Sequence, residues 1–308
     1  MHPWRSPLPM PATRMCVPGC RPLHAHWRAP PGCRMLHPRP ESPGQDGVPP
    51  PMSFQDPQAS PASVDALFAD FSACLRAALP GTSGWPTTFA VLVHCNAWID
   101  RLAAARALIT DVERERVDRQ RRPRDREMHA LAYAFHRMAV ACAMGLPPSG
   151  VPLVRDAMGC PRLPGTPWHT SLSHADGAVA LALSLDGPVG IDLEARARAS
   201  MLPDLVASMC TPAERRRLPG ETADRGPGLL ELWVRKEALL KATGQGMSIE
   251  MTAIEAPPDA WLPLPGDGRD IRIRMLEAGP AHVAALASMA PGAPVTFAWL
   301  APAATPRA

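Results

Sequence analysis

The sequence has little net charge and no long apolar run, and each shortage excludes a class of protein. Its 308 residues include 32 lysines and arginines against 29 aspartates and glutamates, so the formal net charge is only +3 at pH 7. No broad nucleic-acid-binding surface is therefore expected, and any anion site has to be local. No apolar stretch reaches the roughly 18 residues that a membrane-spanning helix needs, and residues 1–5 (MHPWR) do not begin an apolar signal core. We expect a soluble cytoplasmic protein without a nucleic-acid or membrane partner.

The eight cysteines are too scattered to predict a disulfide framework or a zinc site. The one close group, Cys16, Cys20 and Cys33, lies in a proline-rich segment with histidines nearby, and zinc binding there is a lesser alternative.

Residues 1–60 differ in composition from the rest of the chain. They are dense in proline, arginine and glycine and show no sustained hydrophobic period, so they cannot bury enough apolar surface to offset the loss of chain entropy. We predict a disordered tail over 1–60, with translation from Met52 as the alternative. Two folded lobes are predicted after it, one over residues 61–185 and the other over 186–302.

Both lobes alternate helical and strand patterns. Apolar residues at spacings of three and four predict helices, and short apolar runs bounded by turn residues predict strands. The first lobe then holds a helix from residue 62, a long helix that ends at Gly145, and strands over 87–95 and 178–185. The second lobe holds a strand over 189–193, which we pair with 178–185 as a hairpin, helices over 202–218 and 228–243, and closing strands over 271–276, 282–290 and 295–300. This alternation predicts an α+β fold of two similar lobes.

The segment GIDLE, residues 190–194, places two carboxylates on one side of a predicted strand. Residues i and i+2 of a strand point to the same face, so Asp192 and Glu194 project together and repel each other unless a cation lies between them. Mg2+ takes carboxylate oxygens and completes its coordination with phosphate and water. The pair is therefore a candidate metal site, and a solvated strand end is the plainer alternative.

A second motif lies on the predicted helix 228–243. Glu237 and Lys241 are i, i+4 neighbours there, and Lys236 lies on the adjoining face. An ordinary surface ion pair is the alternative, but most other residues of this helix are apolar, so we expect its charges at the rim of a buried groove. Gly244 and Gly246 after the helix allow a close approach of the backbone to a ligand.

A third motif, TSLSHADG over residues 170–177, leads into the predicted strand 178–185. Ser173 and His174 form a conceivable nucleophile and base, but no G-x-S-x-G elbow surrounds the serine. Hydroxyl and imidazole groups beside a turn are equally suited to binding phosphate oxygens.

Together and in this order, the three motifs resemble the signature of the Sfp-type 4'-phosphopantetheinyl transferases. The motifs lie within residues 155–246, and the wider resemblance covers residues 85–300. The resemblance implies two α+β lobes related by a pseudo-twofold axis, with Mg2+ and coenzyme A held between them. It implies a monomeric enzyme that moves 4'-phosphopantetheine from coenzyme A to a serine of an apo acyl- or peptidyl-carrier protein and releases 3',5'-ADP.

The resemblance also implies roles for individual residues. Asp192, Glu194 and Glu237 would hold Mg2+ against the pyrophosphate of coenzyme A, and Glu237 or a nearby acid would take the proton of the attacking serine. Lys241 would neutralise charge on the leaving 3',5'-ADP, and Glu214 would assist the metal or the serine. Coenzyme-binding positions are implied for six further residues: Ser173 and His174 at the 3'-phosphate, and Lys236, Arg162, Arg114 and His129.

The sequence departs from this family at a phosphate-binding lysine. The family's Gly-Lys-Pro is replaced by Gly159-Cys160-Pro161, so the lysine is missing and Arg162 is the candidate substitute. For Arg114 and its basic neighbours, a solvated helix face is the alternative. Two other functions stay open: a degenerate relative that binds coenzyme A or a carrier protein without efficient transfer, and a Mg2+-dependent phosphohydrolase.

Overall fold

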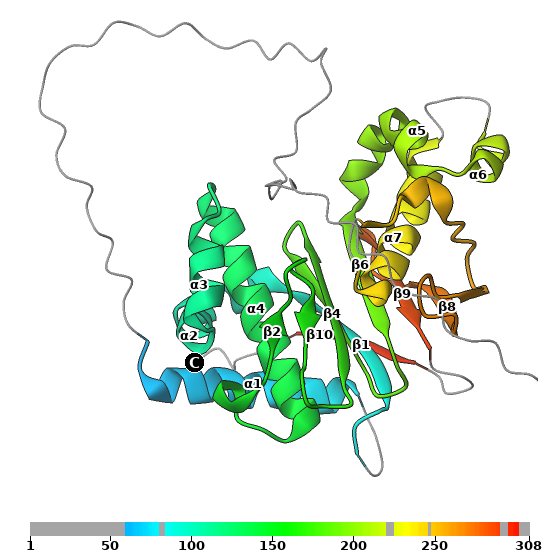
Figure 1. The fold of residues 1–308 in the computed structure, drawn as a ribbon. Helices are drawn as coiled ribbons and strands as arrows, with labels where there is room; N and C mark the ends of the chain where they lie inside the picture. Colours follow the sequence, from blue (N-terminus) through cyan, green and yellow to red (C-terminus); the bar gives the residue numbers. More distant parts are fainter. Residues whose placement is uncertain (1–58, 80–83, 220–224, 246–247, 290–294, 302–308) are drawn as a thin grey trace, which may run out of the picture. The chain divides into compact units, whose positions relative to one another are not determined.

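Two four-stranded β-sheets, each covered by a long helix, dominate the part of the chain that the structure describes (Figure 1). This computed structural model describes residues 59–79, 84–219, 225–245, 248–289 and 295–301. All of them belong to one structural unit, Phe54–Ala308. The tail predicted over 1–60 lies outside the described residues except for its last two positions.

The first half of the chain builds most of the first sheet and its helices. The helices are α1 (Pro61–Ala78), α2 (Leu102–Leu108), α3 (Asp111–Asp118) and α4 (Pro123–Met144), with 3-10 turns at Cys95–Arg101 and Pro148–Gly150. The strands are β1 (Thr88–His94), β2 (Val154–Arg155), β3 (Pro161–Arg162), β4 (His169–Ala175) and β5 (Ala178–Ser184). The Ser60 side chain caps the start of α1, and α4 ends at Gly145 with a φ of 67° that suits glycine. The two helices and two strands predicted for this half are confirmed.

The second half builds the second sheet. Its elements are β6 (Val189–Ala195), a 3-10 helix (Arg196–Leu205), α5 (Val206–Met209), α6 (Pro212–Arg217), α7 (Arg225–Thr243), a 3-10 turn (Met251–Ala253), β7 (Trp261–Pro263), β8 (Asp270–Leu276), β9 (His282–Ser288) and β10 (Thr296–Leu300). The single helix predicted over 202–218 is instead divided before Thr211, because this side chain caps α6 and forms a capping box with Glu214.

The strand orders are β10-β1-β5-β4 in the first sheet and β6-β9-β8-β7 in the second. β5 is antiparallel to both β1 and β4, so both of its edges are occupied, and β6 pairs with β9. The hairpin predicted between residues 178–185 and 189–193 is therefore wrong, because these consecutive strands belong to different sheets. β10 runs parallel to β1 and completes the first sheet, although the sequence boundary had assigned it to the second lobe.

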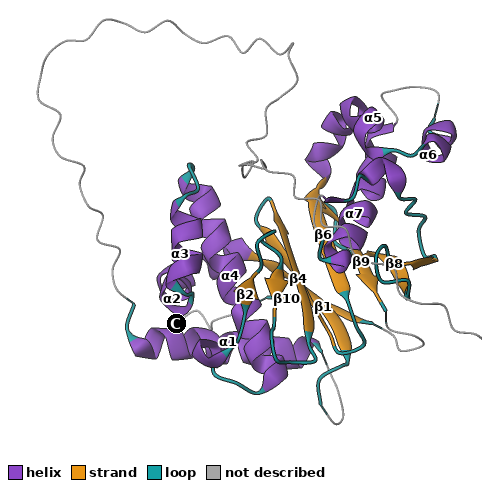
Figure 2. Cartoon of the chain, viewed as in Figure 1, coloured by secondary structure: helices purple, strands orange, loops and turns teal. Residues whose placement is uncertain are grey.

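The two sheets face each other, and the helices cover their outer faces (Figure 2). Between the sheets, Ala90 and Ala180 of the first pack with Ile191 and Leu286 of the second. The residues that alternate with these on β1 and β5 pack against α1 and α4, whereas the opposite face of β8 and β9 packs against α7. The described chain is thus a mixed α/β fold with strands inside and helices outside.

The two halves repeat one order of elements. In each, a strand is followed by a long helix and then by an antiparallel strand pair, whose second strand lies beside the first strand of the half. The pseudo-twofold axis between the halves stays a prediction, because strand order alone does not define an axis. In the part of the chain that the structure describes, no helix combines the length and apolar character needed to cross a membrane.

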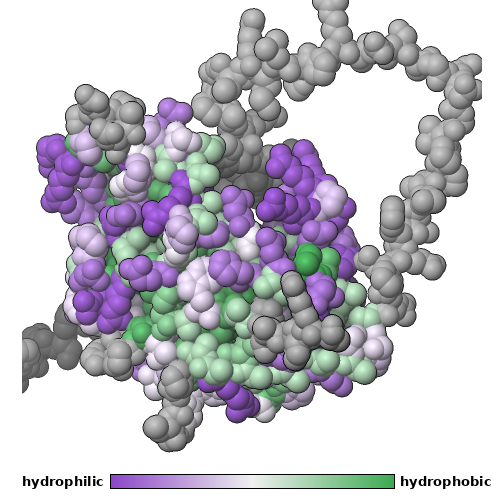
Figure 3. Space-filling view, turned by 180° about the vertical axis from the view of Figure 1, so that it is seen from behind, coloured by the Kyte–Doolittle hydropathy of each residue, from purple (hydrophilic) through white to green (hydrophobic). Residues whose placement is uncertain are grey.

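The surface seen from behind mixes polar and apolar residues (Figure 3). Polar residues gather toward its sides, and apolar residues cover much of its lower middle. Among the described residues, the most exposed large apolar side chains are Met201, Val112 and Met158, which come from three separate segments. Singly exposed apolar residues are common on protein surfaces and carry no functional inference.

Candidate active site

Two edge strands lie side by side where the sheets meet. β4 is the last strand of the first sheet and β6 is the first strand of the second. Ser171 and Ser173 of β4 both bond to β6: the backbone N–H of Ile191 donates to Ser171 Oγ at 3.1 Å, and Ser173 Oγ donates to Asp192 Oδ1 at 2.8 Å. Both serine side chains are buried. The serines of the third sequence motif thus hold the strand that carries the first motif.

Lys241 connects α7 to this junction. Its Nζ lies 2.6 Å from Asp192 Oδ1 and 2.9 Å from Ser173 Oγ. Gly190 allows α7 to come this close, because a Cβ at that position would lie 1.9 Å from the carbonyl oxygen of Ala238. The three motifs therefore meet in one polar cluster, although Ser173 and Lys241 are 68 residues apart in the sequence.

The acidic residues predicted to bind metal carry charge that the protein compensates only in part. Asp192 is 4% exposed, and its Oδ2 is buried without a hydrogen-bond partner among the described residues. Burial, followed by the charge of Asp192, raises the pKa of Glu194 to about 7 and raises the pKa of Glu237 above its usual value. Asp192 thus lies close enough to repel both Glu194 and Glu237, and its unpartnered Oδ2 is the kind of oxygen that Mg2+ coordinates. These residues fit a divalent cation in their donor chemistry.

The same residues do not form a closed metal cage. Within the described ranges, no three His, Cys, Asp or Glu side chains are grouped closely enough to hold an ion. Lys241 is bound to Asp192 Oδ1, and Arg198 forms an ion pair with Glu194. Two positively charged side chains therefore lie beside the carboxylates. Coordination of one metal ion by all three acidic residues stays a prediction.

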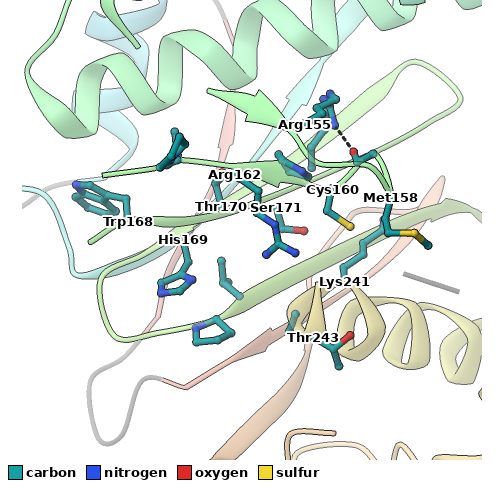
Figure 4. A pocket seen from close by; sticks show the side chains of 18 of the residues that line it. Arg155, Met158, Cys160, Arg162, Trp168, His169, Thr170, Ser171, Lys241 and Thr243 are labelled. Atoms are coloured by element: carbon teal, nitrogen blue, oxygen red, sulfur yellow. Dashed lines mark hydrogen bonds between the residues drawn. The ribbon is translucent and has the colours of Figure 1, made fainter. Parts of the chain in front are cut away.

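A cavity of about 440 Å³ borders this cluster (Figure 4). Its walls come from β3, β4, the loop between β2 and β3, and the end of α7; the labelled side chains are Arg155, Met158, Cys160, Arg162, Trp168, His169, Thr170, Ser171, Lys241 and Thr243. The three acidic residues do not line it. The cavity therefore lies beside the carboxylates, and Lys241 belongs to both the cavity and the polar cluster.

Arg155 is a cavity residue that the sequence analysis missed. Its Nη1 donates to the carbonyl oxygen of Gly159 at 3.1 Å, and its guanidinium carbon lies 4.6 Å from the ring centroid of Tyr133. Its Nε and Nη2 are buried and have no hydrogen-bond partner among the described residues. Unused donors on a cation are suited to an anionic ligand. The sequence offered only a lone arginine after an apolar run, which matches no motif.

His129 and His174 lie together, one on α4 and the other on β4. Their ring centroids are 4.4 Å apart and the rings meet edge to face. Burial, with the nearby His129 and Lys241 as further causes, lowers the pKa of His174 to about 4. His174 is therefore neutral at physiological pH, and any contact it makes with a phosphate is a hydrogen bond rather than an ion pair.

Comparison with known proteins assigns a family to this arrangement. Residues 188–276, which run from β6 to β8, match the family model described as the 4'-phosphopantetheinyl transferase superfamily. This part of the chain belongs to the 4'-phosphopantetheinyl transferase superfamily.

Two curated relatives bear related names. A provisionally named 4'-phosphopantetheinyl transferase of Synechocystis is 27% identical over 147 residues, which are 46% of this chain and 59% of the relative. A 4'-phosphopantetheinyl transferase of Bacillus subtilis is 27% identical over 154 residues, which are 49% of this chain and 66% of the relative. The chain thus spans less than two thirds of the length of either relative.

The position at which the resemblance implies a phosphate-binding lysine lies in the cavity. Cys160 lines the cavity, and burial raises the pKa of its thiol. The predicted substitute, Arg162, also lines it, but its Nε donates to Asp156 Oδ2 at 2.8 Å and its Nη2 to the carbonyl oxygen of Gly244 at 2.9 Å. Arg162 is therefore in the expected place and already bound to the protein.

Lys236, a predicted coenzyme contact, has a different role in the structure. The residue is 1% exposed, and its Nζ lies 2.6 Å from Glu214 Oε2, 2.6 Å from the Met209 carbonyl oxygen and 2.8 Å from the Met251 carbonyl oxygen. All three of its N–H donors are used, so Lys236 forms a buried structural ion pair with Glu214. Glu214 pairs with Lys236 and caps α6, and its assisting role stays a prediction.

Arg114 also lies apart from the polar cluster. Its guanidinium donates to the carbonyl oxygen of Arg106 at 3.2 Å and to that of Ile109, and it pairs with Asp111. These contacts connect α3 to the end of α2. A coenzyme contact of Arg114 stays a prediction, because charge alone does not determine which partner an arginine binds.

Proposed function

We propose that the chain transfers the 4'-phosphopantetheine group of coenzyme A to a serine hydroxyl of an apo acyl- or peptidyl-carrier protein, with Mg2+, and releases 3',5'-ADP. The observation that carries this proposal is the mutual contact of Asp192, Ser173 and Lys241, because it gathers all three motifs beside a cavity. Membership of the superfamily supports the general transferase class.

Asp192, Glu194 and Glu237 are the residues that would hold Mg2+. A bound ion would supply positive charge to the phosphate oxygens of coenzyme A and relieve the repulsion of Asp192 with Glu194 and Glu237. Ser173 acts here as a positioning residue. Together with Lys241 it binds Oδ1 of Asp192, so Oδ2 is the oxygen that would be available to the ion.

Glu237 is the proposed acceptor of the proton from the carrier serine. Burial raises the pKa of this carboxylate, which brings it closer to the working pH and makes it a better base. The serine oxygen forms a bond to the phosphorus that bears pantetheine, and the bond from that phosphorus to the bridging oxygen of the pyrophosphate breaks. Lys241 lies between the cluster and the cavity, where its ammonium can neutralise the charge that develops on the leaving 3',5'-ADP.

Arg155 is the proposed phosphate-binding cation of the cavity. It has two unpartnered N–H positions, whereas Arg162 would have to give up Asp156 or Gly244 to bind a ligand. We propose that Arg155 compensates for the lysine that is absent at Cys160, with His129 and the neutral His174 as neighbours.

One observation favours a second candidate, a relative that binds coenzyme A or a carrier protein without efficient transfer. Cys160 puts a largely neutral thiol where the superfamily has a lysine, so one charge contact to phosphate is lost. This loss weakens coenzyme binding under either candidate, and only the transfer reaction separates them.

The test follows the intact mass of several apo-carrier proteins after incubation with the full chain, coenzyme A and Mg2+. We expect a phosphopantetheine increment, and we expect Asp192→Asn and Glu237→Gln to lower its rate by at least about 100-fold. Glu231→Gln is the matched control, because Glu231 lies on the same helix as Glu237 and is exposed. Coenzyme binding without an increment would identify the degenerate relative, and phosphate release without a carrier would identify a phosphohydrolase.

A further inference from the structure

Arg198 lies against the carboxylate cluster but belongs to none of the three motifs. It is on the 3-10 helix Arg196–Leu205, which directly follows β6. Its guanidinium pairs with Glu194 and stacks on the indole of Trp233, with 4.5 Å between the guanidinium carbon and the ring centroid. The Glu194 side chain is 16% exposed and that of Arg198 33% exposed, so water competes only weakly for this pair.

Two positively charged side chains of the protein pair with different acidic residues of this cluster. Lys241 binds Oδ1 of Asp192, and Arg198 binds Glu194. The charge of Arg198 also acts on Glu237. Of the side-chain oxygens in this cluster, Oδ2 of Asp192 is buried and unpartnered. A divalent ion therefore finds one oxygen ready and has to compete with a guanidinium for another.

We propose that Arg198 is the resident counter-ion of Glu194, which holds this carboxylate in the metal-free protein and has to release it when a divalent ion binds. The inference rests on the proposed function, because the ion is the one that the transfer reaction needs. Trp233 provides a second contact, so Arg198 keeps its place on the indole after it releases Glu194. Arg198 is then a positioning residue that lowers the affinity of the site for metal.

An ordinary i, i+4 surface pair predicts something different. Such pairs contribute little and are screened by salt, so removal of the arginine would leave metal binding unchanged. The low exposure of Glu194 and the stacking on Trp233 distinguish Arg198 from that case. The two explanations therefore predict different effects of removing Arg198 on the affinity of the site for metal.

The experiment titrates the full chain with Mn2+ alone, without coenzyme A or carrier, and measures free Mn2+ by electron paramagnetic resonance. Arg198→Gln removes both the competing contact and a positive charge beside the site, so we expect Mn2+ to bind about tenfold more tightly. Arg196→Gln is the matched control, because Arg196 is exposed and lies on the same 3-10 helix. We expect its Kd for Mn2+ to stay within about twofold of the wild type.

Unchanged or weaker binding of Mn2+ by Arg198→Gln would overturn the inference. The proposed function would still stand in that case if Mn2+ binding depends on Asp192 and the protein modifies a carrier. If Arg198→Gln does not fold, Arg198→Lys decides the question. Lysine keeps the charge but not the planar fork and the stacking, so tighter binding supports the inference and equal or weaker binding overturns it. If Asp192→Asn binds Mn2+ as the wild type does, the metal set of the proposed function fails, and this inference fails with it.

Discussion

Lys236→Met separates the structural role of Lys236 from the coenzyme-binding role that its motif implies. The ammonium is buried against Glu214 and two backbone carbonyl oxygens, at distances of 2.6 to 2.8 Å. Methionine keeps most of the side-chain length and apolar stem, but it removes the charge and all three donors. The substitution therefore leaves a carboxylate and two carbonyl groups without their partner.

The cost follows from these contacts. Breaking a buried ion pair by removing one partner costs about 3–5 kcal/mol, because the other charge stays buried and uncompensated. Glu214 keeps backbone N–H donors from Thr211 at 2.8 Å and from Ala256 at 3.3 Å, which places the loss toward the lower end of that range. We expect the free energy of unfolding to fall by about 3 kcal/mol, a large part of the 5–15 kcal/mol that is typical of a domain.

Urea unfolding, followed by far-ultraviolet circular dichroism, measures this loss. Lys236→Met combined with Glu214→Gln is the control, and it should be less destabilised than Lys236→Met alone, because glutamine removes the stranded charge and keeps an acceptor for the backbone N–H donors. The KM of the folded Lys236→Met protein for coenzyme A should match that of the wild type. A variant with the wild-type urea midpoint and a raised KM would refute the structural assignment and restore the coenzyme contact.

Two further substitutions test the surroundings of the site. Burial lowers the pKa of His174 to about 4 from 6.5, so the unfolded chain binds more protons between these pH values, and stability falls as the pH decreases through that window. His174→Gln should flatten this dependence of the unfolding free energy, and parallel curves for the two proteins would contradict the assignment. Gly190→Ala should cost about 2–3 kcal/mol, because its Cβ would lie 1.9 Å from the Ala238 carbonyl oxygen and would push β6 away from α7. Gly228→Ala, with no heavy atom within 4 Å of its Cβ, should not destabilise the protein, and equal urea midpoints for these two variants would contradict the close packing at Gly190.

Much of the secondary structure could be predicted from local pattern. The spacing of apolar residues predicted α1, α4 and α7, and short apolar runs predicted β1, β5, β8, β9 and β10. The pleat of a strand placed Asp192 and Glu194 on one side, and the structure places both near Lys241 and places Asp192 near Glu237. These successes share a cause, because the helix and strand periods are properties of the backbone and do not depend on distant contacts.

The pairing of strands within the sheets could not be predicted from the sequence. The turn residues between β5 and β6 predicted a hairpin, but β5 already has β1 and β4 on its two edges. Which edge a strand uses depends on the other strands that compete for it, and these come from residues far away in the chain. The placement of β10 beside β1 is decided in the same way.

By itself, the sequence determined which residue types carry the chemistry and which face of its strand or helix each one occupies. Tertiary structure alone decided their partners: Ser173 binds Asp192, and Lys236 is buried against Glu214. Arg155 lines the cavity and has two buried nitrogens without a partner among the described residues. The reason is physical. A charged or hydroxyl side chain binds whatever donor or acceptor the folding of distant segments brings within about 3 Å, and no local period encodes that neighbour.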